Sequence, residues 1–410
     1  MVEKELDKLK NLLRKYFQYG FIVIISFALL SCSKEDDPDP PVVEDEFLLS
    51  FSELATFSQE QMSFLITLGG FGQYLNFLES GAIVYRISYK TTFKNEEISA
   101  SGLVVLPDGD GTYPILSAHH GTIFSNAEAP SAFSVTGGFS GFEFFGGAGY
   151  ITFIPDYIGY GDSKDLLHPY YNAQYTGTAV IDMIMAGKEM LDKLEVSYND
   201  KLFLTGYSEG GYATVAVQKA IEETPSLNLS ITASASGAGG YDIVGVMDEI
   251  LKEETYGTPA YLAFVIYSYA LTNDWTAPLS DFFDEPYASN IPDLFDGSLT
   301  QGQVNDQLTE DLSDLFNGDL LEELRNGAQN DLTELLSKNS VHDWAPESPL
   351  RIYHSPNDNV LPIGNSQSTV QTMMANGADD VQFVEIGGQS HGSAVVFMIE
   401  KVLPWFDSLK

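Results

Sequence analysis

A serine between two glycines is the side chain in this sequence best placed to act as a nucleophile. Ser208 lies in the pentapeptide Gly-Tyr-Ser-Glu-Gly (206–210), which fits the pattern G-x-S-x-G. An apolar run at 201–205 precedes it and a helical pattern follows it, so the serine is expected at a sharp turn between a strand and a helix. A serine hydroxyl attacks a carbonyl group only when a base removes its proton. Histidine is the usual base for such a serine.

Six histidines could supply that base, and His391 has the most favourable position. It follows the expected last strand, 381–386, in a glycine-rich loop, and it precedes the final helical pattern. Asp358 follows the preceding strand, 350–354, and its carboxylate is expected to orient the imidazole. Asp242, which follows an earlier strand, is the alternative acid.

The elements that must position these side chains alternate between strands and helices. Short β-rich runs lie at 100–106, 113–118, 150–155, 202–207, 231–236, 350–354 and 381–386, and helical patterns lie between several of them, for example at 178–194, 210–223 and 366–375. Nearly continuous apolar strands that alternate with helices are typical of a parallel sheet covered on both faces. The sequence therefore predicts an α/β fold with a mostly parallel sheet flanked by helices.

The alternation stops between residues 241 and 345. This segment has no convincing strand, but it has helical patterns at 304–316 and 320–336. It contains 21 Asp and Glu residues against three Lys and Arg residues. We interpret it as a helical cap inserted into a core formed by residues 47–240 and 346–410. The stretch Pro259–Tyr267 is apolar on every face and is expected to be buried, against the core or over a pocket.

With these motifs in this order, the chain resembles the α/β-hydrolase superfamily, and within it the bacterial and fungal secretory lipases and esterases, over about 87–405. The segment His-His-Gly-Thr (119–122) resembles the oxyanion motif of that family. The resemblance implies an oxyanion hole formed by the backbone N–H groups of Thr122 and Glu209, with His120 and Gly121 supporting the loop. Gln is more usual than Glu at position 209.

These residues predict a serine hydrolase that cleaves carboxylic esters through an acyl-enzyme. Ser208 would be the nucleophile, His391 the base and Asp358 the residue that orients the base. A serine peptidase of the prolyl or aminopeptidase type on the same fold is an alternative, and a surface binding lipoprotein without catalysis is another. His342 and His354 are expected to be packing or surface residues.

The composition excludes several other classes of function. A net charge of −38 opposes the binding of nucleic acids, whose phosphates require a basic surface. The sequence contains no spaced set of metal ligands, no phosphate-binding G-x-x-x-x-G-K-[ST] motif and no dinucleotide fingerprint. We therefore expect neither a metal nor a cofactor.

Residues 1–32 have the pattern of an export signal, with five basic residues followed by an apolar run at 21–30. That run is shorter than the roughly 20 residues that a membrane-spanning helix needs. Leu-Leu-Ser-Cys (29–32) resembles the lipobox of bacterial lipoproteins, and Cys32 is the only cysteine in the chain. Residues 33–46 are acidic and proline-rich, as in an extended linker. The sequence thus predicts an exported lipoprotein anchored through Cys32, in the outer membrane or at the cell surface.

Overall fold

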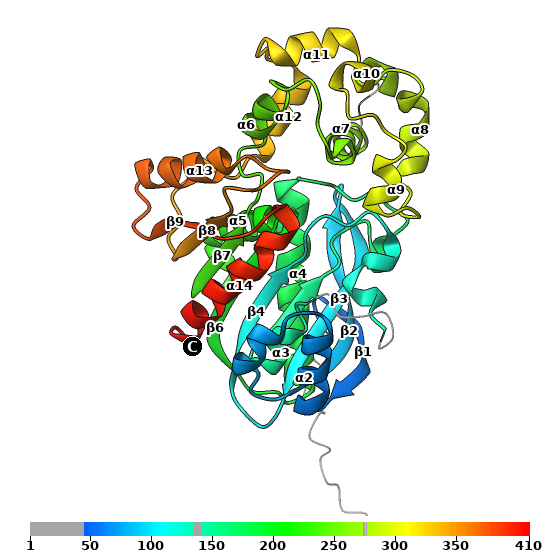
Figure 1. Cartoon of the computed structure of the whole chain (residues 1–410). Coiled ribbons are helices and arrows are strands. Elements are labelled where there is room, and N and C mark those ends of the chain that lie inside the picture. Colours follow the sequence, from blue (N-terminus) through cyan, green and yellow to red (C-terminus); the bar gives the residue numbers. More distant parts are fainter. Residues whose placement is uncertain (1–44, 135–140, 274, 276) are drawn as a thin grey trace, which may run out of the picture. The chain divides into compact units, whose positions relative to one another are not determined.

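The computed structural model describes residues 45–410 except 135–140, 274 and 276 (Figure 1). The predicted export signal, Cys32 and nearly all of the predicted linker lie outside the described residues. Residues 45–410 form one compact unit. Within it, no described helix combines the length and the apolar character that crossing a bilayer requires.

A nine-stranded sheet runs through the described residues in the order β1-β2-β3-β5-β4-β6-β7-β8-β9. The strands are β1 (Leu48–Phe57), β2 (Gly81–Phe93), β3 (Glu96–Asp108), β4 (Tyr113–His119), β5 (Ile151–Pro155), β6 (Tyr198–Tyr207), β7 (Ala233–Gly237), β8 (Leu350–His354) and β9 (Val381–Glu385). β1, β2 and β3 pair antiparallel, β3 pairs antiparallel with β5, and the remaining pairs are parallel. The prediction of a mostly parallel sheet is confirmed.

Helices cover both faces of this sheet. Neighbouring side chains along a strand point to opposite faces, so two consecutive residues of β6 show which helices lie on each face. Phe203 of β6 contacts Phe406 of α14 (His391–Asp407), with ring centroids 4.6 Å apart. The next residue, Leu204, belongs to the apolar cluster formed with α4 (Ala173–Lys193) and α5 (Glu209–Glu222). The face that carries α14 also carries α2 (Gln59–Leu68) and α3 (Phe144–Gly147), whereas α13 (Ile363–Ala375) packs near β8 and β9.

Between β7 and β8 the chain forms a series of helices beyond one end of the sheet (Figure 1). They are α6 (Ile243–Ile250), α7 (Pro259–Thr272), α8 (Tyr287–Leu294), α9 (Gln301–Asn305), α10 (Leu312–Leu315), α11 (Gly318–Arg325) and α12 (Asp331–Asn339). The continuous helices predicted at 304–316 and 320–336 are wrong, since each is divided in two. Asp311 caps a new helix by accepting a hydrogen bond from the backbone of Ser313, and Gly327 has a φ of 67°, which ends α11.

Helix α7 connects this cap to the core through aromatic contacts. Phe264 stacks on Phe295 of the cap at 4.8 Å and on Tyr170 of the core at 4.7 Å. Most side chains of α7 are buried, as expected from an apolar sequence without a polar face. The cap therefore contacts the core close to the loop that carries Tyr170.

Candidate active site

Ser208 lies at a strained turn between β6 and α5. Its φ of 61° and ψ of −124° are unfavourable for a residue with a Cβ atom, and its backbone N–H donates to the carbonyl of Gly237 at 2.8 Å. A Cβ at Gly206 would collide with the carbonyl oxygen of Gly210, and a Cβ at Gly210 would collide with that of His119. Three backbone segments therefore approach one another so closely that both positions of the motif require glycine. The Ser208 side chain at this turn is half-buried.

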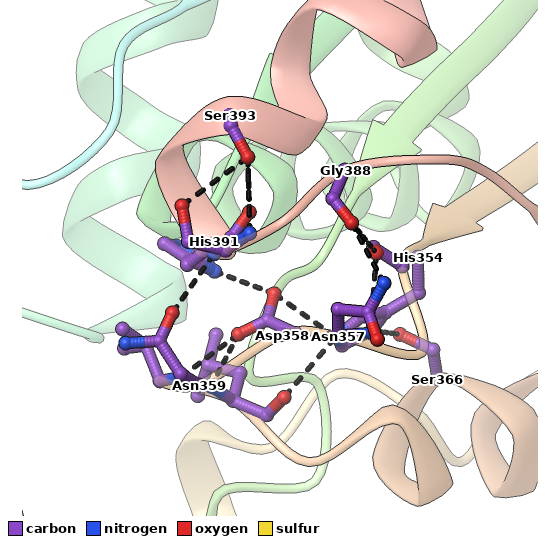
Figure 2. Close-up of polar contacts among 12 residues, drawn as sticks. His354, Asn357, Asp358, Asn359, Ser366, Gly388, His391 and Ser393 are labelled. Atoms are coloured by element: carbon purple, nitrogen blue, oxygen red, sulfur yellow. Dashed lines mark hydrogen bonds and ion pairs between the residues drawn. The ribbon is translucent and has the colours of Figure 1, made fainter.

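His391, the first residue of α14, contacts Asp358 in the loop after β8 (Figure 2). Its Nδ1 atom lies 2.6 Å from Oδ2 of Asp358, whose side chain is only 1% exposed. The backbone N–H of His391 donates to Oδ1 of Asn359 at 3.0 Å, which fixes the start of the helix. Because the carboxylate accepts the Nδ1 proton, the lone pair of the neutral ring is on Nε2. This Nε2 is buried and makes no hydrogen bond with any described residue.

The Asp358 carboxylate is held by several donors. Its Oδ1 accepts from the backbone N–H groups of Val360 and Leu361, both at 2.9 Å. Its Oδ2 has a second histidine partner, His354, whose Nε2 lies 3.2 Å away. Burial acts to raise the pKa of Asp358, but the hydrogen bonds from His354 and His391, the charge of His391 and the Leu361 amide hold it well below its usual range. Sequence reasoning gave His354 no part in this site; its only signal was the spacing of four residues from Asp358.

The structure places His391 beside the nucleophile turn. Its ring lies 5.1 Å, between centroids, from that of Tyr207, the residue before Ser208. The alternative acid, Asp242, has a different role, because it caps α6 by accepting from the backbone N–H of Gly245 at 3.0 Å. Asp358, which is in contact with His391, is therefore the acid that the geometry favours.

The predicted oxyanion loop lies against the same turn. A Cβ at Gly121 would lie 3.3 Å from the carbonyl oxygen of Tyr207 and 3.5 Å from Cβ of Ser208, so the loop passes within contact distance of the nucleophile turn. The hydroxyl of Thr122 is 2.9 Å from that of Tyr170. His120 supports the loop, with Nδ1 2.7 Å from the carbonyl oxygen of Gly121. On the other side, Glu209 is the first residue of α5, so its N–H has no acceptor within the helix.

A family model described as secretory lipase matches residues 147–408. The chain belongs to the secretory lipase family. No curated protein sequence matches it. Among solved structures, a putative hydrolase from Legionella pneumophila is 26% identical, with a TM-score of 0.81 over 89% of this chain and 98% of that one.

Two solved structures with lower sequence identity share the fold of this secretory lipase family member. The rice cell wall degrading esterase LipA from Xanthomonas oryzae, in a ligand-bound form, is 24% identical, with a TM-score of 0.79 over 90% of this chain and 100% of that one. Candida antarctica lipase A in its closed state is 15% identical, with a TM-score of 0.65 over 89% of this chain and 82% of that one. The fold is that of the α/β-hydrolases, and the chain is a hydrolase of the lipase or esterase type.

The side chain of Glu209 forms a buried pair that sequence reasoning did not predict. Its Oε1 lies 2.6 Å from Nε2 of His168, and both side chains are at most 3% exposed. Nδ1 of His168 donates to the carbonyl of Ile158 at 2.7 Å. The carbonyl oxygen of His168 in turn accepts from the hydroxyl of Ser268 in α7 at 3.0 Å. The first residue of the nucleophile helix is thus linked through one histidine to the cap.

His119 is a structural histidine. Its Nδ1 lies 2.8 Å from Oγ1 of Thr214, and Nε2 lies 3.0 Å from Oγ of Ser117. The Thr214 hydroxyl donates to the carbonyl of Gly210, so Nδ1 of His119 is the donor and Nε2 accepts from Ser117. Burial, with a smaller effect of the neighbouring His120, lowers the pKa of His119 to about 3. The ring therefore stays neutral and ties β4 to α5 beneath the turn.

Ser208 lines a small cavity of about 50 Å³ between the core and the cap. Apolar side chains of α6 and α7 form one wall, among them Ile243, Met247 and Leu262. Leu361, whose backbone N–H donates to Asp358, forms part of another wall. In the residues that the structure describes, no group of three or more His, Cys, Asp or Glu side chains could hold a metal ion.

Proposed function

We propose that this protein hydrolyses carboxylic esters by a Ser-His-Asp acyl-enzyme mechanism. The observation that carries the proposal is the 2.6 Å contact between Asp358 and His391, which leaves the buried Nε2 of His391 as a base beside the Ser208 turn. The strained backbone of the serine supports the same role, because a nucleophile at such a turn is exposed to a substrate rather than packed in the core.

In the acylation step, Nε2 of His391 accepts the proton of the Ser208 hydroxyl while Oγ bonds to the ester carbonyl carbon. The carbonyl oxygen becomes an oxyanion, to which the backbone N–H groups of Thr122 and Glu209 donate; each such donor contributes roughly 10²–10³ in rate. The imidazolium then gives its proton to the alcohol oxygen as the C–O bond breaks. Asp358 stabilises the imidazolium throughout.

In the deacylation step, a water molecule takes the place of the alcohol. His391 removes one proton from the water, whose oxygen bonds to the acyl carbon, and returns the proton to Oγ of Ser208 as the acid leaves. The enzyme is regenerated, and the reaction consumes one water per ester. No cofactor is needed for either step.

The cavity beside Ser208 supports an uncharged, apolar acyl group as substrate. Its walls from α6 and α7 are apolar, and the cap around them is acidic, which disfavours anionic substrates. The Xanthomonas oryzae and Candida antarctica structures are described as an esterase and a lipase, which agrees with ester cleavage. No observation favours the peptidase alternative or a binding protein without catalysis.

We also propose that the protein is exported and anchored to a membrane through a lipid on Cys32. Membership of the secretory lipase family supports export, and the lipobox-like residues 29–32 support the anchor. Expression of the full chain and of Cys32→Ser, followed by membrane fractionation, tests this proposal. The wild type should be found with membranes and the variant in the soluble fraction; an equal distribution would reject the anchor.

The catalytic proposal is tested with the full chain, purified in detergent, and short p-nitrophenyl esters. The wild type should hydrolyse them and react covalently with a fluorophosphonate probe. Ser208→Ala should lose both activities while keeping the thermal unfolding temperature of the wild type. Full activity in this variant, or absence of probe labelling in the wild type, would reject Ser208 as the nucleophile.

A further inference from the structure

The carboxylate of Asp358 lies between two histidines (Figure 2). Its Oδ2 atom is 2.6 Å from Nδ1 of His391 and 3.2 Å from Nε2 of His354. His354 is the last residue of β8 and its side chain has no exposed surface. It is therefore held in place by the sheet, whereas His391 lies at the start of a helix beside the nucleophile turn.

The contacts of the His354 ring determine where its proton lies. Nε2 is 3.1 Å from the carbonyl oxygen of Leu361, and a carbonyl oxygen only accepts, so Nε2 carries the hydrogen. That hydrogen is shared between the Leu361 carbonyl and Oδ2 of Asp358. Nδ1 lies 2.7 Å from Oγ of Ser366 in α13, a hydroxyl that can donate to this nitrogen or accept from it. Whichever role Ser366 takes, Nε2 of His354 is a donor to the acid.

With this donor, both oxygens of the carboxylate have fixed partners. Oδ1 accepts two backbone N–H groups, those of Val360 and Leu361, and Oδ2 accepts the two histidines. Rotation of the carboxylate about its Cβ–Cγ bond would break several of these bonds at once. The lone pair that remains on Oδ2 is consequently directed at His391.

We propose that His354 is a positioning residue for the acid, whose Nε2–H fixes Oδ2 of Asp358 for its contact with His391. This inference rests on the proposed function, since it concerns the same Ser-His-Asp mechanism. His354 itself touches no substrate, and it acts only through Asp358. Its loss should therefore affect the chemical step more than substrate binding.

The charged and titratable groups around Asp358 predict how the pH dependence would change. They are His354 and His391, which donate to it, and Tyr207 and Tyr256, which face it from β6 and from the cap. Burial raises the pKa of both tyrosines, with Asp358 adding to the effect, so they stay neutral through the range of an assay. Burial raises the pKa of Asp358, and the hydrogen bond from His354 opposes that effect. Loss of this hydrogen bond should therefore raise the pKa of Asp358.

A more basic carboxylate accepts more strongly from Nδ1–H of His391 and so favours the doubly protonated ring. In that ring Nε2 carries a proton and cannot act as a base, and this inactive state would persist to higher pH. Loss of the His354 donor should therefore move the acidic limb of the kcat/KM profile to higher pH.

The test uses His354→Phe in the full chain, with His342→Phe, a partly buried histidine of the cap segment, as the matched control. We expect kcat to fall about tenfold or more, as for loss of a hydrogen bond to a charged group, with KM within about twofold and the acidic limb moved upward. His354→Gln, which offers an amide donor, should recover part of the loss. A folded His354→Phe protein with the kcat and pH profile of the wild type would overturn the proposal.

A second measurement on the wild type does not depend on the folding of any variant. In ¹⁵N-histidine NMR spectra, Nε2 of His354 should carry the proton at neutral pH, and an Nε2 without a proton would overturn the proposal. Fluorophosphonate labelling of Ser208 in the same sample reports separately on the proposed function. Absent labelling together with a protonated Nε2 would place the failure in the function and not in the geometry of His354.

Discussion

Oε1 of Glu209 lies 2.6 Å from Nε2 of His168, inside the protein and one residue after the serine of the nucleophile turn. Because Nδ1 of His168 already donates to the carbonyl of Ile158, a single proton between Nε2 and Oε1 joins the pair. The second oxygen, Oε2, is buried without a partner among the described residues. The pair fixes the first turn of α5, whose leading N–H is a proposed oxyanion donor.

Glu209→Gln should therefore be tolerated, with activity within about threefold of the wild type, because an amide N–H donates to Nε2 of His168. Glu209→Ala leaves that nitrogen buried and unpaired, which costs about 1–3 kcal/mol of unfolding free energy. It should also lower kcat by loosening the oxyanion donor. Denaturant unfolding and ester kinetics on both variants measure these effects; an alanine variant as stable as the glutamine variant would contradict the role of the pair.

Asp358→Asn should reduce kcat/KM by about 10³-fold or more, because an asparagine amide favours the wrong tautomer of His391. Asp242→Asn is the matched control, since asparagine caps a helix about as well as aspartate. Its activity should stay within about twofold of the wild type. The reverse order of the two effects in an ester assay would move the acid to Asp242.

Gly210→Ala should destabilise the fold by more than about 3 kcal/mol and abolish activity, because its Cβ collides with backbone that cannot move independently. Gly364→Ala, in the first turn of α13, provides the comparison, since an added Cβ there meets no atom within 4 Å. It should be neutral or stabilise the protein by up to about 1 kcal/mol. Thermal and denaturant unfolding distinguish the two outcomes, and a stable, active Gly210→Ala protein would disprove the close packing.

Acid should destabilise the protein in part through His119. Its pKa is lowered by burial to about 3 in the folded chain, so between roughly pH 6.5 and pH 3 the unfolded chain binds a proton that the folded chain does not. The stability that depends on the neutral ring is complete above this range and decreases as the pH falls through it, by about 1.4 kcal/mol per pH unit.

The unfolding free energy of His119→Gln should therefore depend less steeply on pH than that of the wild type. His342→Gln serves as the control for loss of a histidine elsewhere. Urea unfolding at a series of pH values gives the slopes. Equal slopes for His119→Gln and the wild type would show that His119 does not contribute to acid sensitivity.

The parallel strands were predictable because each is a short apolar run between turn residues; β8, for example, has the predicted bounds of 350–354. β1 and β2 were not predicted, since the first predicted strand begins at residue 100. β1 is an edge strand, mostly exposed, so its sequence has no continuous apolar signal. The cap helices were predicted too long, since short polar caps inside an apolar pattern are weak signals next to periodicity.

Asp358 and His391 follow the neighbouring parallel strands β8 and β9. Because such strands end at the same edge of the sheet, sequence order alone indicates that the two side chains lie close together. The contacts of His354 and His168 were not predicted. His354 lies only four residues before Asp358, but that spacing alone does not show that the two side chains meet. The contact of His168 depends on how loops pack on the finished sheet. The Glu209–His168 pair spans 41 residues of chain and depends on the turn at Ile158.

The cavity of about 50 Å³ at Ser208 is small beside the roughly 300–1,000 Å³ of typical ligand sites. An ester larger than this space fits beside Ser208 only if α6 or α7 moves, and α7 is held by the Ser268 bond and the stacked ring of Phe264. For such an ester we expect motion of the cap, as well as bond breaking, to contribute to the turnover rate. The expected outcome is a kcat that falls in viscous solvent and changes with substitutions at the contacts of α7.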